Sequence, residues 1–326
     1  MNISGRGTIV IGLGLAAGVA AYIVARRRTA RITGGDTFDS AVPVSVNYHF
    51  TRQCDFSCGF CFHTAKTSYV LPVAEAKRGL SLLKAAGTRK VNFAGGEPFL
   101  EKEYLGELLT HCKAIGMESV SIVSNGGRIT RHFLKAHADN IDILAVSCDS
   151  FNRETNSMIG RKSGNPLSRL RNIAKWCREF NIKFKLNTVV NRYNVDEDMN
   201  EQISELNPFR WKCFQVLVDE SENNHAEALR DVTPFLITDE EFASFIQRHR
   251  KQLCLVEEPN DVMRSSYLIL DEYMRFLSKE GDYYVSPSIL DVGVREALDV
   301  TTWRQDRFLT RRGIYDWSKK ESVFDW

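Results

Sequence analysis

From residue 44 onward, short apolar runs alternate with stretches in which apolar residues recur at helical spacing. A strand, a helix and a second strand in this order form a parallel βαβ unit, so the body of the chain is predicted to have an α/β fold. Several such units in succession suggest a full or partial barrel that binds its ligands at the carboxyl ends of the strands. The predicted strands are residues 44–50, 90–94, 120–124, 141–147, 183–190 and 211–218, and the predicted helices are residues 72–86, 104–115, 131–138 and 167–180.

The strand pattern weakens beyond Val218, and this change marks a predicted domain boundary. Residues 44–218 form the predicted barrel, and residues 219–326 are predicted to be an appended, mainly irregular C-terminal extension. Thr238 and Glu241 have the spacing of a capping box, which predicts one helix at that point.

The first 43 residues are predicted to be a hydrophobic anchor and a linker. Residues 8–25 contain no charge and are followed directly by three arginines, Arg26 to Arg28. A run of this length is near the lower limit for a membrane span, and positive charge after it favours a cytosolic body. A signal anchor, most simply in the endoplasmic reticulum, is therefore preferred to a cleaved targeting peptide or a buried or interfacial helix.

The chain has 43 Lys and Arg and 41 Asp and Glu side chains, but five of the arginines and none of the acids lie in residues 1–34. The remainder is therefore mildly acidic, with 38 basic groups against 41 acidic groups. Binding to nucleic acid without sequence preference depends on surplus positive charge. Direct nucleic-acid binding is therefore not expected, and any phosphate ligand needs a local pocket of cations.

Three of the eight cysteines lie directly after the first predicted strand, in the pattern Cys54-x3-Cys58-x2-Cys61. Three thiolates can hold three irons of a [4Fe–4S] cube and leave the fourth iron open, since four cysteines close the usual cluster. The alternative is a zinc ion with His63 as the fourth ligand. The spacing alone leaves both alternatives open.

The sequence Gly95-Gly96-Glu97-Pro98 follows the second predicted strand. Two glycines allow the backbone to approach a ligand closely, and the Glu97 carboxylate can accept a hydrogen bond from an ammonium group. On its own this sequence is a turn signal. Together with the cysteines, however, it resembles the radical S-adenosylmethionine (SAM) superfamily, in which the cysteines hold the cluster and a GGE motif binds the methionine amino group. The resemblance favours an iron–sulfur enzyme over a zinc protein.

The same resemblance extends to the ends of the next two predicted strands. Ser124-Asn125-Gly126 follows the third strand, and Ser147 ends the fourth. Without the resemblance, Ser-Asn-Gly is a strand-to-loop turn. In the superfamily, such strand ends contact the ribose and the carboxylate of the cofactor. The cofactor contacts implied by the resemblance are Gly95, Gly96, Glu97, Asn125 and Ser147.

Longer segments resemble the viperin-like radical SAM nucleotide dehydratases, over nearly the whole of residues 44–326. They include NYHFTRQCDFSCGFCFHTAKTSYVLP, KVNFAGGEPF, SIVSNG, NRYNVDEDM, NPFRWKCFQ and SYLILDEYMRFL. The resemblance implies a partial (β/α)6 radical SAM barrel whose C-terminal extension closes the substrate site. It also implies a [4Fe–4S] cluster, SAM and an electron donor. Animal members begin with an amphipathic helix, whereas this chain has a hydrophobic segment there, so the membrane targeting of the family does not transfer.

The implied reaction converts a nucleoside triphosphate, with CTP favoured, to its 3′-deoxy-3′,4′-didehydro analogue, a chain-terminating antiviral nucleotide. It proceeds by abstraction of the 4′ hydrogen and loss of the 3′ hydroxyl. The cofactor supplies the difficult chemistry, and the barrel positions the ribose and excludes water. Nothing in the sequence pattern identifies the base.

Cations on the predicted strands agree with this assignment. A triphosphate carries about four negative charges and needs several cations in a water-excluded pocket. Lysine is otherwise uncommon on buried strands, although a single one could be a solvated strand end or a salt bridge. Four cations on three strands favour a polyphosphate pocket, and the resemblance matches them to triphosphate contacts: Lys90, Lys185, Arg210 and Lys212.

The resemblance also places Asn47, Asn187 and Tyr267 near the ribose or the base. Tyr267 is the predicted catalytic residue, since it could stack, donate a hydrogen bond or reduce a product radical. The alternative for Tyr267 is a half-buried tyrosine of the core.

Two other functions remain open at this point. The first is another radical SAM enzyme that acts on a peptide or on a different nucleotide, although the extension lacks the second cysteine cluster of many peptide-modifying enzymes. The second is a membrane-anchored, zinc-binding interaction protein.

Overall fold

The computed structural model describes residues 43–161, 166–220, 222–263, 265–278, 285–311 and 313–319. The predicted hydrophobic segment at residues 8–25 lies outside this part of the chain. None of the helices in the described residues is long and apolar enough to cross a membrane.

The described strands belong to one sheet with the order β10-β9-β8-β1-β2-β3-β4-β5-β6-β7. Neighbours from β8 through β1 to β7 are parallel, and the pairs β8–β9 and β9–β10 are antiparallel. All six predicted strands are confirmed. The strands are β1 (Ser45–Thr51), β2 (Lys90–Gly95), β3 (Ser119–Ser124), β4 (Ile143–Ser147), β5 (Lys183–Val190), β6 (Arg210–Gln215), β7 (Leu255–Glu258), β8 (Ile269–Leu270), β9 (Arg275–Leu277) and β10 (Val285–Ser288).

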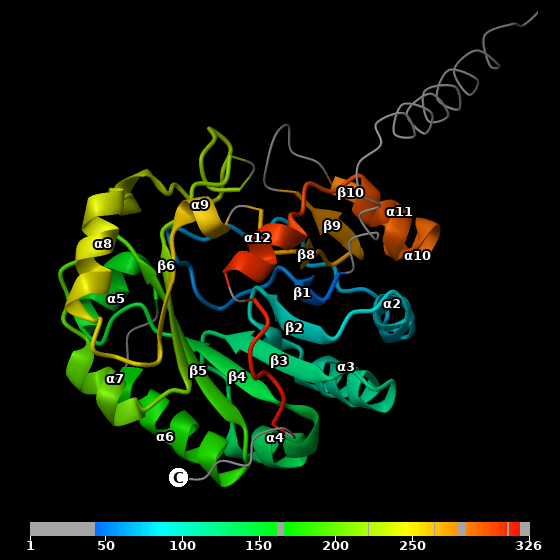
Figure 1. Ribbon diagram of the computed structural model, residues 1–326, viewed down its shortest axis with the longest axis horizontal. Helices are drawn as coiled ribbons and strands as arrows, with labels where there is room; N and C mark the ends of the chain where they lie inside the picture. The colour runs from blue at the N-terminus through cyan, green and yellow to red at the C-terminus, as the bar shows by residue number, and fades with distance from the viewer. Residues whose placement is uncertain are drawn as a thin grey trace, which may run out of the picture. The chain divides into compact units, whose positions relative to one another are not determined.

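The sheet is curved, and the larger helices cover its outer face (Figure 1). The four predicted barrel helices and the capped helix after Thr238 are confirmed, whereas two short helices after β4 and β5 were not predicted. The helices are α2 (Val73–Ala85), α3 (Lys102–Ala114), α4 (Arg131–Ala136), α5 (Arg153–Ile159), α6 (Pro166–Glu179), α7 (Asn200–Leu206), α8 (Asp239–Arg248), α9 (Asn260–Met263), α10 (Ile289–Val292), α11 (Val294–Asp299) and α12 (Gln305–Thr310).

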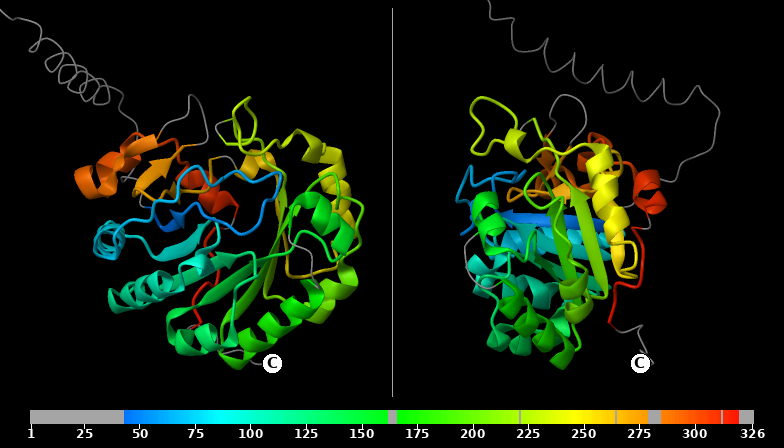
Figure 2. Two further views of the ribbon diagram at one scale, coloured as in Figure 1. Left: turned by 180° about the vertical axis from the view of Figure 1, so that it is seen from behind. Right: turned by 90° about the vertical axis from the view of Figure 1, so that its left-hand side faces the viewer.

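Alternation along the strands separates an apolar layer from a polar interior. Successive side chains of a strand point to opposite faces, and in β1 Val46, Tyr48 and Phe50 are fully buried in the apolar core beneath the helices. The intervening Asn47 therefore points to the concave side. Both views of Figure 2 show the helices outside and the strands inside, so one face of each strand is left for polar side chains.

The sequence predicted a mainly irregular C-terminal extension, and this prediction is wrong, because the extension contributes four strands to the sheet. Strand β7 pairs in parallel with β6, and β8 pairs in parallel with β1, so this part of the chain extends the barrel sheet at both edges. Strands β8 and β9 have two and three residues, and β7 and β10 have four. Such short strands show no period that a sequence pattern can reveal.

The last described residues, 313–319, run along the concave side of the sheet, as the red segment in Figure 1 shows. The Ser119 hydroxyl donates to the Trp317 carbonyl (2.8 Å), and the Lys183 amino group donates to the carbonyls of Asp316 and Ser318 (both 3.0 Å). Ser119 begins β3 and Lys183 begins β5. The tail therefore covers the amino-terminal ends of the central strands.

We predict that Trp317→Ala destabilises the fold, because the Trp317 side chain is only 1% exposed in a small cluster with Ile143 and Phe308. Loss of a buried tryptophan costs about 3–5 kcal/mol. Urea denaturation should show this decrease in the free energy of unfolding. Leu253→Ala is the control, because Leu253 is fully exposed and its removal should change stability little. A Trp317→Ala protein as stable as this control would contradict the packing described.

Candidate active site

The three clustered cysteines lie in the loop after β1, here called the cysteine loop (residues 52–64). Its backbone is fastened to the end of α5: the Ser57 N–H donates to the Gly160 carbonyl (3.1 Å), and the Gly59 N–H donates to the Ile159 carbonyl (3.0 Å). A Cβ atom at Gly59 would lie 2.3 Å from the Phe235 ring, so only glycine fits there. The cysteine loop is therefore positioned by main-chain contacts.

The cysteine loop is also held by hydrogen bonds from the loop after β2, which carries the two predicted glycines. The Gly96 N–H donates to the Thr51 carbonyl, and the Glu97 N–H donates to the Gln53 carbonyl, both at 2.7 Å. Gly95 has a φ of +130°, and a Cβ atom there would lie 2.2 Å from the Thr51 oxygen. The close approach expected of these glycines is therefore an approach to the cysteine loop. Their predicted contact with a cofactor stays a prediction.

The Glu97 carboxylate is fully buried and bound to the protein. It accepts hydrogen bonds from the Phe99 N–H (3.0 Å), the Ser124 hydroxyl (2.8 Å) and the Asn125 N–H (2.7 Å). Burial raises the pKa of Glu97, and these three donors oppose the rise. Glu97 thus joins the end of β3 to the loop after β2, while its predicted bond to a ligand ammonium group stays a prediction.

The cysteine side chains differ in their exposure. Cys54 is exposed, and Cys58 and Cys61 are partly buried. His63, the fourth ligand of the zinc alternative, is buried with its ring edge-on to His49 at 4.4 Å.

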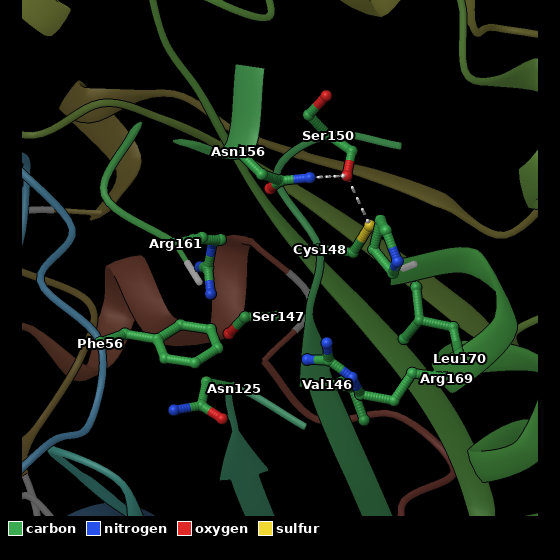
Figure 3. Close-up of a pocket in the computed structure, with 11 residues that line it drawn as sticks. Phe56, Asn125, Val146, Ser147, Cys148, Ser150, Asn156, Arg161, Arg169 and Leu170 are labelled. Carbon is green, nitrogen blue, oxygen red and sulfur yellow. Dashed lines mark hydrogen bonds between the residues drawn. The ribbon is translucent and has the colours of Figure 1, made fainter. Parts of the chain in front are cut away.

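An open pocket of about 390 Å³ lies beside the cysteine loop, at the carboxyl ends of β3 and β4. Asn125 and Ser147, both predicted as cofactor contacts, line it together with Phe56 and Arg161 (Figure 3). The Asn125 amide donates to Asp55 (2.8 Å) and lies 3.9 Å from the Cys54 sulfur. The structure therefore brings two of the predicted residues next to the metal-binding loop.

Arg161 was missed by sequence reasoning. It follows the left-handed Gly160 that ends α5, and nothing in the local sequence indicates a site. Its guanidinium is paired with the buried Asp149 and lies 6.0 Å from the centre of the Phe56 ring. This places a nearly buried cation on the wall of the pocket, where it can attract a carboxylate.

The predicted cations gather on the concave side of the sheet. Strand register sets Lys185 beside Arg210 and Asn187 beside Lys212. Lys185 and Arg210 make no ion pair with any described residue, while the Arg210 guanidinium lies 4.1 Å from the centre of the Tyr315 ring. The concave side is here called the lumen, and these strands supply its cationic wall.

Lys90 lies near the amino-terminal end of the lumen, close to the C-terminal tail. Its amino group donates to the hydroxyls of Ser121 (2.8 Å) and Ser119 (3.3 Å). It also lies 5.5 Å from the ring centres of Tyr315 and Trp317. Among the described residues, the Lys90 amino group is thus contacted by hydroxyl groups and aromatic rings and forms no ion pair with a carboxylate.

The Asn47 side chain accepts a hydrogen bond from Asn92 (3.0 Å) and donates to the Leu268 carbonyl (3.3 Å). Asn47 thereby joins β1 and β2 to the chain just before β8. Asn92 was not predicted, although its position two residues after Lys90 places it on the same face of β2.

Tyr267 lies among cations. Its hydroxyl accepts hydrogen bonds from Lys212 (2.8 Å) and Arg311 (3.3 Å), and the Arg311 guanidinium lies 4.0 Å from the ring centre. Glu258 completes this group by pairing with both Lys212 and Arg311. Neither Arg311 nor Glu258 was predicted, because both lie in the part of the chain that had shown no strand pattern.

Burial perturbs the lumen lysines strongly. It lowers the pKa of Lys90 and of Lys212 to about 7 and holds that of Lys185 well below its usual value. Neighbouring cations add to the effect in each case, whereas Glu258 opposes it at Lys185 and Lys212. These lysines therefore lose their protons far more readily than an exposed lysine, and a bound polyanion would raise their pKa values again.

Several buried polar atoms of the lumen have no hydrogen-bond partner among the described residues. They are Asn187 Oδ1, Arg210 Nε, Arg311 Nε and Glu258 Oε2. Buried polar atoms are nearly always paired in folded proteins, so a group of unpaired ones indicates a site for a polar ligand. Two of them, Arg210 Nε and Arg311 Nε, are guanidinium donors that a phosphate ligand could use.

Comparisons with known proteins agree with this geometry. Residues 48–206 match the profile of the Radical SAM superfamily. The protein named S-adenosylmethionine-dependent nucleotide dehydratase RSAD2 of Danio rerio is 52% identical, over 92% of this chain and 85% of the relative. The S-adenosylmethionine-dependent nucleotide dehydratase of Flammeovirga pacifica is 34% identical, over 84% of this chain and 96% of the relative.

Solved structures share the fold. The structure of Streptococcus suis SuiB bound to S-adenosylmethionine is similar with a TM-score of 0.59 at 14% identity, over 92% of this chain and 78% of that one. The structure of anSMEcpe with bound AdoMet and a peptide is similar with a TM-score of 0.61 at 13% identity, over 81% and 82% of the two chains. At such low identity the likeness establishes the fold alone.

We predict that Gly95→Ala prevents normal cluster assembly, because the new Cβ atom would press on the Thr51 carbonyl and displace the cysteine loop. Iron content and visible absorbance after anaerobic reconstitution measure the loss. Gly116→Ala is the matched control: Gly116 also has a positive φ (+77°) but has nothing within 4 Å of an added Cβ atom. It should suffer only backbone strain of about 1–3 kcal/mol. Equal iron content in the two variants would contradict the prediction.

Proposed function

This chain belongs to the S-adenosylmethionine-dependent nucleotide dehydratases of the Radical SAM superfamily, and from this we propose that it acts on CTP. The proposed product is 3′-deoxy-3′,4′-didehydro-CTP, formed by removal of the 4′ hydrogen and the 3′ hydroxyl. The choice of cytosine rests on the resemblance to the viperin-like enzymes. Such a product terminates nucleic-acid synthesis, because it has no 3′ hydroxyl, and this agrees with a proposed antiviral role.

The cationic lumen is the observation that carries the proposal of a triphosphate substrate. Five cationic side chains surround it, and Glu258 is the carboxylate paired within that group. With all six groups charged, the net charge of these side chains is plus four. A triphosphate carries roughly four negative charges, because its terminal phosphate is close to doubly ionised. The five cations are Lys90, Lys185, Arg210, Lys212 and Arg311.

The cofactors of the superfamily are a [4Fe–4S] cluster and SAM, and the residues near the cysteine loop suit both. Cys54, Cys58 and Cys61 would hold the cluster, while Asn125 and Ser147 would line the place of SAM. When bound, the two cofactors supply the radical chemistry of the reaction. An external donor must provide the electron that the cluster uses.

Arg161 has a defined part in this proposal. It is the cation on the pocket wall, and its pairing with Asp149 fixes the guanidinium in place. The carboxylate of SAM is the anion that such a cation would hold at the edge of the cysteine loop.

Tyr267 is proposed to touch the substrate. Burial raises its pKa well above the usual value, so the phenol stays protonated at neutral pH despite the nearby cations. Held by Lys212 and Arg311, its ring and hydroxyl are fixed before a nucleotide enters. A protonated phenol can donate a hydrogen bond to the ribose or to the leaving hydroxyl.

The central test is an assay of the reconstituted enzyme. The protein is loaded with iron and sulfide without oxygen, given SAM and a reductant, and offered CTP, UTP, GTP and ATP separately. Mass spectrometry should detect 5′-deoxyadenosine and, with CTP, a nucleotide lighter by one water. Cys61→Ala should abolish both products, whereas Cys254→Ala, which removes a cysteine far along the chain from the cluster loop, should retain them. If no nucleotide stimulates 5′-deoxyadenosine formation, the proposal is wrong.

We also propose that residues 8–25 anchor the enzyme in the membrane of the endoplasmic reticulum with its body in the cytosol. The uncharged run and the arginines that follow it support this orientation. In cells, the full chain should remain with membranes after extraction with alkaline carbonate, and a chain that lacks residues 1–43 should be released. Extraction of the full chain would contradict the anchor.

A further inference from the structure

Glu258 is the buried acid of the cationic lumen. It ends β7 and is 1% exposed, and its Oε1 atom pairs with the Lys212 amino group and with the Arg311 guanidinium (3.3 Å). Its second oxygen has no hydrogen-bond partner among the described residues. A carboxylate in this position weakens the attraction of the lumen for an anion, so its presence needs an explanation.

The groups that face Glu258 come from four parts of the chain. Lys212 comes from β6, Lys185 comes from β5, and Arg311 follows α12. Tyr267, before β8, lies against Lys212 and Arg311. Glu258 is therefore surrounded by cations and phenol, and burial, which raises its pKa, is outweighed by Lys212 and Arg311, so that the pKa is lowered.

The pairing is reciprocal. The pKa of Lys212 is lowered to about 7 by burial together with Arg311 and Arg210, and Glu258 limits this fall through its charge and its hydrogen bond. Without Glu258, burial and the charges of Arg311 and Arg210 would lower the pKa of Lys212 with no carboxylate to oppose them. A neutral Lys212 would lose its attraction for phosphate.

We propose that Glu258 is a positioning residue, which keeps Lys212 in its ammonium form beside Tyr267 before the substrate arrives. The proposal rests on the proposed function, since it assumes that the lumen binds a polyphosphate. In this role the negative charge of Glu258 weakens the attraction of the lumen for an anion. The same charge keeps the Lys212 ammonium group available as a hydrogen-bond donor near neutral pH.

The proposal predicts how many protons accompany binding. A bound polyanion raises the pKa of each nearby lysine, so a lysine that is neutral in the free enzyme takes up a proton, and one that is already charged does not. Below pH 7 the wild-type Lys212 is mostly charged before binding, whereas in Glu258→Gln its pKa is lower and a larger fraction of it is neutral. Each additional proton makes the affinity fall about tenfold more for each unit of rising pH.

The experiment measures this uptake directly. Full-length enzyme with its cluster and SAM is titrated without oxygen with inorganic tripolyphosphate and with CTP by calorimetry, in buffers of different ionisation enthalpy. At pH 6, Glu258→Gln should take up more protons than wild type, by up to about one proton for each ligand bound. At pH 8.5 the difference should disappear, because Lys212 is then neutral in both proteins. Protons released by the ligand itself cancel in the comparison.

Glu257→Gln is the matched control, because Glu257 is the adjacent residue of the same strand and is exposed. Its proton uptake should equal that of wild type at both pH values. Equal uptake by wild type and Glu258→Gln at pH 6 would overturn the proposal. A purely structural role of Glu258 would weaken binding at every pH without this change in proton number.

A second variant allows the same test if Glu258→Gln does not fold. The double variant Glu258→Gln/Lys212→Gln removes both charges of the pair together, which avoids an unpaired buried charge. It should take up the same number of protons as wild type at pH 6 and about one fewer at pH 8.5. A deficit at pH 6 would show that Lys212 is not held charged in wild type, and the proposal would fail.

The titrations distinguish a failure of the proposed function from a failure of the role proposed for Glu258. If wild-type enzyme binds neither tripolyphosphate nor CTP, the proposed function fails and the role of Glu258 fails with it. If wild type binds both ligands with proton uptake but Glu258→Gln shows the same uptake at pH 6, only the role of Glu258 is lost.

Discussion

The burial of positive charge on the concave side of a parallel sheet is the constraint on which the rest of the structure depends. Burial makes ammonium groups lose protons, so each lumen cation needs a neighbour that offsets the cost. Residues beyond 218 supply most of these neighbours: Glu258, the rings of Tyr267 and Tyr315, and the tail around Trp317. The C-terminal extension is thus the part of the fold that makes a cationic lumen possible.

The two ends of the site are built by different means. At the cysteine loop, position is set by the main chain, through hydrogen bonds from Gly96 and Glu97 and glycines that leave no room for a side chain. In the lumen, position is set by side-chain charge across strands that are distant in sequence. The first arrangement uses main-chain groups, which do not titrate. The second responds to protons and to any anion that enters.

This division explains what the sequence could predict. The barrel strands were predictable because each is long enough for apolar periodicity, and the loops after β1 and β2 carry motifs within a few residues. Lys185 and Lys212 were predictable because a lysine on an apolar strand conflicts with its surroundings. Glu258 and Arg311 were not, since a four-residue strand has no usable period and their pairing joins segments 53 residues apart. The donors to Glu97 from Ser124 and Asn125 also depend on tertiary structure.

The tail that covers the amino-terminal ends of β3 and β5 has a consequence for how the enzyme matures. Translation proceeds from the amino terminus, so the barrel strands leave the ribosome well before residues 313–319 do. Until then Lys90 and Lys183 lack the aromatic and carbonyl partners that the tail provides. The amino-terminal end of the lumen can therefore close only after residues 313–319 have been synthesised, and a chain that stops before them leaves these charges at an open end.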